Sequence, residues 1–316
     1  MPRGISFHRL PTEQPLPASR RLDRLPPLAL LRLMSREDRR AVRAVERQHD
    51  PIARAIRLIA DALRRGGRLV FVGAGTSGRL GVLEAAECPP TFSTPPVLVQ
   101  AMMAGGRSAV FRSREGAEDD REAGRRAARN RVRAGDVVVG IAASGVTPFV
   151  DAALRTVTAR GAHTILITGN PHSPIRATVR IPLTVGPELL AGSTRLKLGT
   201  ATKLVLNMLT LGTMVRLGKT YGHWMVDVRP ASRKLLARAL RLVARLAPCS
   251  LRTAREALRR SRGSVKAAVL ITRDGLTVAQ AHRLLAQHHG SLREALDTRA
   301  EKASEGLSRL KKREKA

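Results

Sequence analysis

The chain has 316 residues and a formal net charge of +32, yet its basic residues are spread along its length and only 2% of its residues are aromatic. So few stacking side chains argue against single-stranded nucleic acid as a partner and favour a generally arginine-rich surface. Two cysteines predict no disulfide framework, and no apolar stretch matches a signal peptide or a membrane span. These features exclude a secreted disulfide scaffold and predict a soluble, cytoplasmic protein.

The first part of the chain, residues 1–34, is rich in Pro and Arg and is expected to form an N-terminal arm. Ser35, which is followed by acidic residues, predicts the start of a first helix, and Pro51 predicts the start of a second. A short apolar run at 69–72 then predicts a buried strand. The main domain is expected to occupy residues 35–230.

A glycine-rich turn at 73–78 follows that strand and precedes an apolar helix. Glycines let the backbone approach a ligand, amides at a helix start attract an anion, and hydroxyls add donors. The spacing also matches the dinucleotide fingerprint, but the next expected strand, at 97–102, lacks the acidic residue that this fingerprint requires. The turn therefore favours a phosphate monoester. The candidate ligands are Gly75, Thr76, Ser77 and Gly78.

A second turn of this kind, at 143–148, follows another expected strand at 136–142. Pro148 suits the first position of a helix, so an ordinary helix start capped by a hydroxyl is the alternative to a binding site. Two such turns, each directly after a buried strand, favour a shared site. The candidate ligands here are Ser144, Gly145 and Thr147.

An acidic cluster lies between the two turns. Five of the chain's 25 acidic residues fall between Glu115 and Glu122. They are interpreted either as the acidic first turn of a helix that runs to about 134 or as part of a site. The sequence leaves both readings open.

Two more strands are expected at 162–168 and 179–185, and their alternation with helices predicts an α/β fold with a parallel sheet. In such a sheet both turns lie at the carboxyl ends of the strands, where open α/β sheets bind ligands. A long apolar helix at 198–217 is read either as a dimer interface or as a core helix. From 231 to 298 the pattern predicts a small helical module, with a recurring Gly-Ser start at 263 and 290, and 299–316 reads as a charged tail.

Two glutamates near the turns suit general acid–base chemistry. Glu87 is expected at the carboxyl end of the helix after the first turn, where the helix dipole would raise its pKa. Glu118 is expected near the start of the next helix, where the dipole would favour the carboxylate. One protonated acid and one ionised base would result, although the sequence does not show that the two meet.

At this point the chain resembles the N-acetylmuramic acid 6-phosphate etherases. The resemblance runs from about residue 12 to 296 and rests on the segments GAGTSGRLGVLEAAECPPTF, EGAEDD, DVVVGIAASG-x-TP, VGPELLAGSTRLK and LGKTYGHWMVDV. It implies a sugar isomerase (SIS) domain built as a three-layer αβα sandwich, a small C-terminal helical module and a homodimer. It also implies cleavage of the D-lactyl ether of N-acetylmuramic acid 6-phosphate in peptidoglycan recycling, without metal or nucleotide.

The resemblance further implies roles for individual residues. Glu87 would protonate the departing lactate, and Glu118 would act as the base. The segment after the fifth strand would line the site near the dimer interface, through Glu188, Ser193, Thr194 and Lys197. The chain departs from the family pattern in having Val146 for an Arg, Ser232 for an Asn and Pro15-Leu16 for an Arg-Asn pair.

Two other functions compete with this one. An aldose–ketose sugar-phosphate isomerase would use the same fold, but both glutamate motifs match the etherases. A non-catalytic sugar-phosphate sensor, as in the glucokinase regulatory protein, is disfavoured because both glutamates are present.

Overall fold

The computed structural model describes residues 8, 10–230 and 232–301, so most of the predicted charged tail and part of the predicted arm lie outside the described residues. The chain divides into two compact units. We call Met1–Glu87 with Pro95–Thr213 the sheet unit, and Cys88–Thr94 with Met214–Ala316 the helical unit. The division falls earlier in the chain than the boundary at 230/231 expected from composition.

The sheet unit is built on five parallel strands in the order β2-β1-β3-β4-β5. The predicted parallel α/β fold is confirmed. Gly73, the last residue of β1, pairs with Met103 of β2 and with Ile141 of β3, so these three strands end level with one another. The strand bounds are β1 Leu69–Gly73, β2 Val99–Met103, β3 Val137–Ile141, β4 His163–Thr168 and β5 Val179–Pro182.

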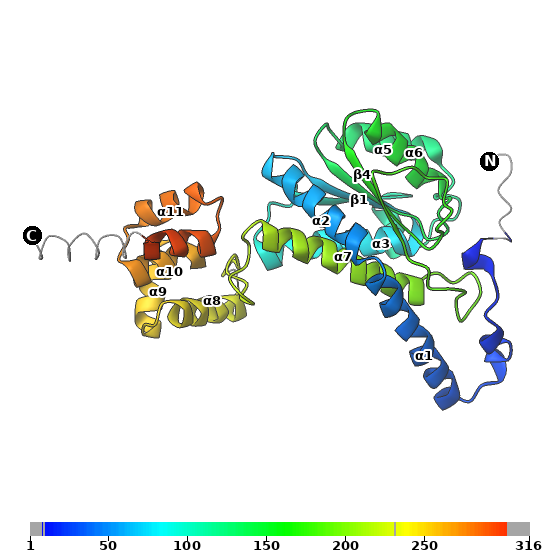
Figure 1. Ribbon diagram of the computed structural model, residues 1–316, viewed down its shortest axis with the longest axis horizontal. Helices are drawn as coiled ribbons and strands as arrows, with labels where there is room; N and C mark the ends of the chain where they lie inside the picture. The colour runs from blue at the N-terminus through cyan, green and yellow to red at the C-terminus, as the bar shows by residue number, and fades with distance from the viewer. Residues whose placement is uncertain (1–7, 9, 231, 302–316) are drawn as a thin grey trace, which may run out of the picture. The chain divides into compact units, whose positions relative to one another are not determined.

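Helices cover both faces of this sheet, which gives the predicted three layers (Figure 1). On one face α5 and α6 pack on Val70, Val72 and Val138. On the other face α3 lies so close that a Cβ at Gly81 would come within 2.8 Å of the Phe71 Cβ atom. The helix bounds are α1 Pro27–Glu46, α2 His49–Arg64, α3 Gly75–Phe92, α4 Ser108–Phe111, α5 Arg121–Arg131, α6 Pro148–Thr158 and α7 Lys197–Arg216.

Two predictions about helices need correction. The first helix begins at Pro27 and not at Ser35, because Pro27 occupies the first helical turn, where its fixed φ angle fits. The expectation that no stretch matches a membrane span is also wrong by length and composition, since α7 passes that test. The most apolar part of α7 is 56% buried inside the fold, so the observation is weak evidence for a membrane and fits a core helix.

The helical unit consists of short helices that begin at hydroxyl caps. The side chains of Ser232, Ser250, Ser264 and Thr277 each accept a hydrogen bond from the third residue of the helix that follows. Ser232 therefore caps α8, a position for which Asn is equally suited. The bounds are α8 Arg233–Leu246, α9 Leu251–Arg260, α10 Val265–Asp274 and α11 Val278–Gln287, and a further helical run begins at 292.

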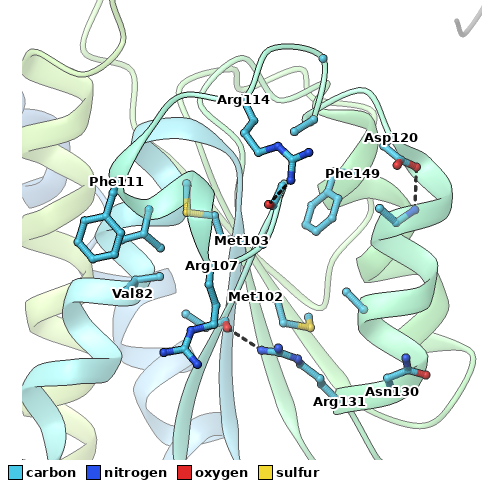
Figure 2. A pocket seen from close by; sticks show the side chains of 18 of the residues that line it. Val82, Met102, Met103, Arg107, Phe111, Arg114, Asp120, Asn130, Arg131 and Phe149 are labelled. Carbon is cyan, nitrogen blue, oxygen red and sulfur yellow. Dashed lines mark hydrogen bonds between the residues drawn. The ribbon is translucent and has the colours of Figure 1, made fainter.

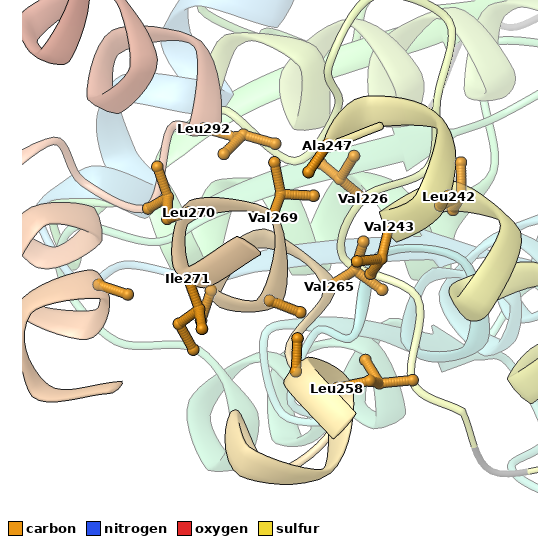
Figure 3. Close-up of a cluster of buried hydrophobic side chains, with 14 of the residues drawn as sticks. Val226, Leu242, Val243, Ala247, Leu258, Val265, Val269, Leu270, Ile271 and Leu292 are labelled. Atoms are coloured by element: carbon orange, nitrogen blue, oxygen red, sulfur yellow. The ribbon is translucent and has the colours of Figure 1, made fainter. Parts of the chain in front are cut away.

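The apolar faces of these helices meet in a core of their own (Figure 3). Val243 of α8, Leu258 of α9 and Val269 of α10 are at most 3% exposed. The recurring Gly-Ser starts, predicted from sequence, take the same form: Gly263 and Gly290 have φ angles of +85° and +81°, which favour glycine. The helical unit is thus held together by its own buried residues.

Candidate functional site

The first glycine turn is tighter than predicted, because α3 already begins at Gly75. A Cβ at Gly78 would lie 2.7 Å from the Gly73 carbonyl oxygen, so the backbone approach in this turn requires glycine. Thr76 and Ser77 are half-buried residues of the first helical turn. The amides of this turn and two hydroxyls therefore lie together at the positive end of the α3 dipole, which suits an anion.

The second turn lies beside the first, because β3 is the neighbour of β1 in the sheet. Gly145 has a φ angle of +74°, and a Cβ there would come within 2.7 Å of the Ser173 Cβ atom. Thr147 is the N-cap of α6, but its side chain makes no capping hydrogen bond. Ser144 Oγ accepts a long, 3.4 Å bond from the Val146 amide. The predicted alternative of a hydroxyl-capped helix start is therefore not realised.

The acidic cluster forms a loop between these turns. Its helix, α5, begins only at Arg121, with Asp120 as the cap that accepts from the Ala123 amide at 2.8 Å. The Phe149 amide donates to the Glu118 carbonyl oxygen at 2.9 Å, which fixes the loop to the start of α6. The interpretation of the acidic cluster as the first turn of a helix is therefore wrong for the residues before Arg121.

The electrostatic prediction for Glu118 is also wrong. The pKa of Glu118 is raised, first by partial desolvation of the carboxyl group and then by the negative charges of Asp119 and Glu115. Glu118 precedes the helix by three residues and Asp120 occupies the cap, so the helix dipole does not favour its ionised form. A carboxylate of this kind accepts a proton more readily than an ordinary glutamate.

A cavity of about 140 Å³ joins the first turn to Glu118. The structure thus brings Gly75 and Glu118 together. It also places two arginines in this cavity, Arg79 and Arg114, which the sequence reasoning passed over. Their positions in the sequence indicate a role in the site, because Arg79 directly follows the first turn and Arg114 directly precedes the acidic cluster.

A third segment, at 192–199, approaches the first turn. A Cβ at Gly199 would lie 3.9 Å from the Thr76 Cγ2 atom and 3.5 Å from the Thr194 carbonyl oxygen. Ser193 and Thr194 are half-buried there. This packing brings the predicted residues Ser193 and Thr194 into the neighbourhood of the phosphate turn.

Two further residues predicted for the site, Glu188 and Lys197, make buried contacts within the fold. Glu188 is buried, and its carboxyl oxygens accept from the amides of Lys197 at 3.2 Å and Leu198 at 3.0 Å, which caps α7. Burial raises the pKa of Glu188, against the lowering effect of these amides and of the Lys197 charge, while Asp38 raises it further. The Lys197 ammonium is buried and pairs with Glu37 at 2.6 Å. The Glu188 carboxylate thus contacts the start of α7, and the Lys197 ammonium contacts Glu37.

Glu87 is not at a helix end, because α3 continues through Pro89 and Pro90 to Phe92. The expected position of Glu87 at a helix end is therefore wrong, and the helix dipole gives no physical reason for a role as acid. Glu87 is exposed and lies twelve residues after Gly75 in the same helix, which corresponds to roughly 18 Å along the axis. Glu84, one turn earlier, is buried and pairs with Lys203 at 2.6 Å. A single chain thus brings Glu118, but not Glu87, to the first turn.

A larger groove of about 1060 Å³ adjoins the small cavity, between α3 and α5 at the edge formed by β2 (Figure 2). Among residues 8, 10–230 and 232–301, no group of three or more His, Cys, Asp or Glu side chains is placed to hold a metal ion.

Comparison with known proteins identifies the family of the chain. Residues 51–158 match the model of the glucokinase regulatory protein N-terminal SIS domain, and residues 121–212 match the SIS domain model. An N-acetylmuramic acid 6-phosphate etherase of Synechocystis sp. is 50% identical over 302 residues, covering 94% of this chain and 99% of the relative. The etherase of Yersinia pestis is 48% identical and covers 92% of this chain and 100% of the relative. The chain belongs to the N-acetylmuramic acid 6-phosphate etherase family.

Proposed function

We propose that this protein is a carbon–oxygen lyase that cleaves the D-lactyl ether of N-acetylmuramic acid 6-phosphate. The products are N-acetylglucosamine 6-phosphate and D-lactate, and the reaction belongs to peptidoglycan recycling in the cytoplasm. The observation that carries the proposal is identity of about 50% to etherases along almost the whole chain. The match to the regulatory protein's domain covers only residues 51–158 and does not favour a sensor over the enzyme.

The 6-phosphate would bind in front of α3. Amides of the first helical turn and the hydroxyls of Thr76 and Ser77 would donate to it, and Ser144 and Thr147 would approach from the neighbouring turn. The close backbone contact at Gly78 and the positive φ angle of Gly145 keep both turns tight. Anchoring this end of the sugar leaves C2 and C3 to be positioned against the acidic loop.

Glu118 would act as the base. When the sugar ring is open, the C2 proton lies next to the C1 aldehyde and is acidic enough to be removed. Glu118 takes this proton, the electron pair forms the C2–C3 double bond, and the C3–O bond breaks as lactate leaves. Water then adds its oxygen to C3, and a proton returns to C2. The raised pKa of Glu118 suits a group that must both accept and return a proton.

Glu87 would protonate the departing lactate, in a homodimer where Glu87 of the partner subunit reaches the site. Two facts support this arrangement: Glu87 is exposed, and about 18 Å of helix separates it from Gly75 in its own chain. A two-fold dimer would place the same residue in both sites.

The activity is tested by incubating the purified protein with N-acetylmuramic acid 6-phosphate and measuring released D-lactate. Release is expected without added metal or nucleotide, and no release from folded protein would contradict the proposal. N-acetylglucosamine 6-phosphate should not be converted to a ketose, which separates the etherase from an isomerase.

The dimer is tested by mixing two inactive variants, Glu87→Gln and Glu118→Gln, under conditions that let subunits exchange. If the two glutamates act across the interface, each mixed dimer holds one intact site. Random pairing then restores about a quarter of wild-type activity. If both act within one chain, every site in the mixture lacks one glutamate and no activity returns.

A further inference from the structure

The small cavity and the groove share one wall. Both are lined by Met103 and by the four residues from Arg114 to Ala117. The cavity of about 140 Å³ is smaller than the roughly 300 Å³ at which small-molecule sites begin. A sugar phosphate anchored at the start of α3 must therefore extend beyond this cavity, and the adjoining groove has the room to receive it.

Arg114 carries the positive charge of this shared wall. Its Nη1 atom donates to the Gly105 carbonyl oxygen at 3.1 Å, and its Cδ atom would lie 3.1 Å from a Cβ at Gly105. Figure 2 shows its side chain reaching from the loop into the groove, on the side of Phe149. Among the described residues no carboxylate forms an ion pair with it. Because a guanidinium has five N–H donors, most of them remain for a ligand.

Three neighbouring charged groups already have hydrogen-bond partners. Arg79, the second cation of the small cavity, donates through Nε and Nη2 to the carbonyl oxygens of Val110 and Ala109, both at 2.8 Å. Glu115 accepts from the Ser113 hydroxyl at 3.0 Å, and Asp120 caps α5. The second turn contributes Val146, which has no charge. Arg114 is thus the cation of the shared wall, and it has more unused donors than Arg79.

We infer that Arg114 binds the carboxylate of the lactyl group, and that the groove beyond it receives this group as it leaves. The inference rests on the proposed function, because it is the etherase substrate that carries a second anion besides its phosphate. The phosphate belongs at the start of α3, and a carboxylate beside Glu118 and Asp119 needs a cation to offset their repulsion. The planar guanidinium pairs with a carboxylate through two parallel hydrogen bonds. Arg114 would then determine specificity for muramic over glucosamine phosphates.

The test compares two ligands that share the phosphate and differ in the lactyl group. Arg114→Gln should lower kcat/KM for N-acetylmuramic acid 6-phosphate by about 10- to 100-fold, the loss of a charge-assisted hydrogen bond. The inhibition constant of the product, N-acetylglucosamine 6-phosphate, should stay unchanged. Arg114→Lys should recover part of the loss, because it restores the charge without the fork. Arg126→Gln, an exposed α5 variant that lines neither cavity, should behave as wild type.

The outcomes separate the possibilities. An unchanged kcat/KM in Arg114→Gln would overturn the inference. Equal weakening of both ligands would also overturn it, since Arg114 would then only support the loop. Should Arg114→Gln fail to fold, Arg114→Lys gives the same comparison with a milder change, and unaltered discrimination by it would count against the inference. Absence of D-lactate release by the wild type would instead reject the proposed function and this inference with it.

Discussion

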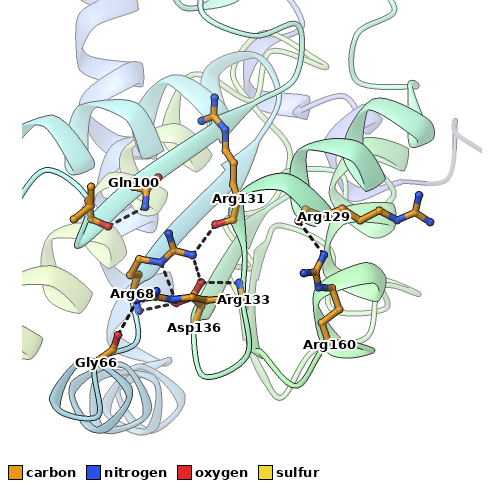
Figure 4. A network of polar contacts seen from close by, with 9 residues as sticks. Gly66, Arg68, Gln100, Arg129, Arg131, Arg133, Asp136 and Arg160 are labelled. Atoms are coloured by element: carbon orange, nitrogen blue, oxygen red, sulfur yellow. Dashed lines mark hydrogen bonds and ion pairs between the residues drawn. The ribbon is translucent and has the colours of Figure 1, made fainter.

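The two ends of the parallel sheet each hold a key carboxylate, in opposite surroundings. At the amino ends of β1 and β3, Asp136 is fully buried and accepts from the Arg68 amide and guanidinium and from the Arg133 amide, at 2.7–3.2 Å (Figure 4). At the carboxyl ends, Glu118 lies at the surface with its carboxyl group partly desolvated. This desolvation raises its pKa most, and the like charges of Asp119 and Glu115 raise it further.

The difference separates stability from chemistry within one sheet. A buried carboxylate that accepts several hydrogen bonds holds the surrounding loops together. A carboxylate crowded by like charges is less stable as an anion and is ready to accept a proton. The guanidinium groups of Arg133 and Arg131 donate to the Gly66 and Ala101 carbonyl oxygens and so extend the hydrogen-bond network around Asp136. At the opposite end of the sheet, the glycine turns remain free for a ligand.

The largest expected effect is on activity at the open end. Glu118→Gln removes the base and should lower the rate of D-lactate release by about 10²–10⁴-fold. The free energy of unfolding should change little, because the side chain is exposed. A lactate assay and thermal unfolding on the same sample check both expectations. The matched control is Glu122→Gln, an exposed acid that pairs with Arg125 at 3.0 Å. Equal rates in the two variants would show that the acidic loop has no base.

The reverse pattern is expected at the closed end. Asp136→Ala leaves two amides and a guanidinium without their acceptor and should lower the free energy of unfolding by about 3–5 kcal/mol. The protein that remains folded at low temperature should keep its turnover. Denaturant unfolding with the lactate assay measures this.

A control for that experiment is Asp61→Ala, which removes an exposed pair with Arg64. This substitution should lower the free energy of unfolding by no more than about 1 kcal/mol. Equal losses of unfolding free energy in Asp136→Ala and Asp61→Ala would mean that the burial of Asp136 adds nothing to its effect on stability.

Much of this contrast could be read from the sequence, because strand pattern and turn chemistry are local. All five strands and both glycine turns were predicted, since short apolar runs bounded by glycines have few alternatives. Helix limits were not predicted as well. The helix after the first turn begins at Gly75, inside the glycine segment, and it includes Pro89 and Pro90 in its last turn. Local rules treat those residues as breaks, and tertiary packing overrides them.

The site was harder to predict, because it depends on residues distant in sequence. The buried pair of Lys197 with Glu37 spans 160 positions, and no local pattern signals it. The expected place of Glu118 near the first turn agrees with the cavity that both share, but its electrostatic surroundings follow from where α5 begins. The separation of Glu87 from Gly75 follows from the helix that is predicted after the first turn. The two prolines conceal only that this helix continues beyond Glu87 to Phe92.

A smaller effect is expected for the phosphate ligands of the open end. Ser77→Ala or Ser144→Ala removes one donor to the phosphate and should weaken binding of N-acetylglucosamine 6-phosphate by about 1.5–3 kcal/mol. Calorimetric titration measures this. Ser19→Ala, whose hydroxyl donates to the Leu16 carbonyl oxygen, is the control with no expected effect on binding. Unchanged affinity in both turn variants would contradict a shared phosphate site.

The smallest effect concerns the pH dependence of the reaction. Because the base must be ionised, kcat/KM should fall as pH drops through the raised pKa of Glu118. Replacing its charged neighbours, in the double variant Glu115→Gln with Asp119→Asn, removes two of the three causes of the raised pKa. The acidic limb of the profile should therefore move to lower pH. Desolvation is the largest cause and remains in the double variant, so the pKa of Glu118 stays raised and the limb moves only part of the way back.

The direction of this shift distinguishes the assignment of the base from a purely structural role of the loop. Glu122→Gln, on the far side of the Asp120 cap, should leave the acidic limb in place, because Glu122 is not among the causes of the raised pKa. Stability depends on this pKa as well. A glutamate whose pKa is raised by folding stabilises the fold below its ordinary pKa and loses that contribution as pH rises through the raised value. The double variant should therefore lower stability at acidic pH slightly, relative to neutral pH, while it extends activity to lower pH. A limb that stays in place in the double variant would assign the essential ionisation to a group other than Glu118.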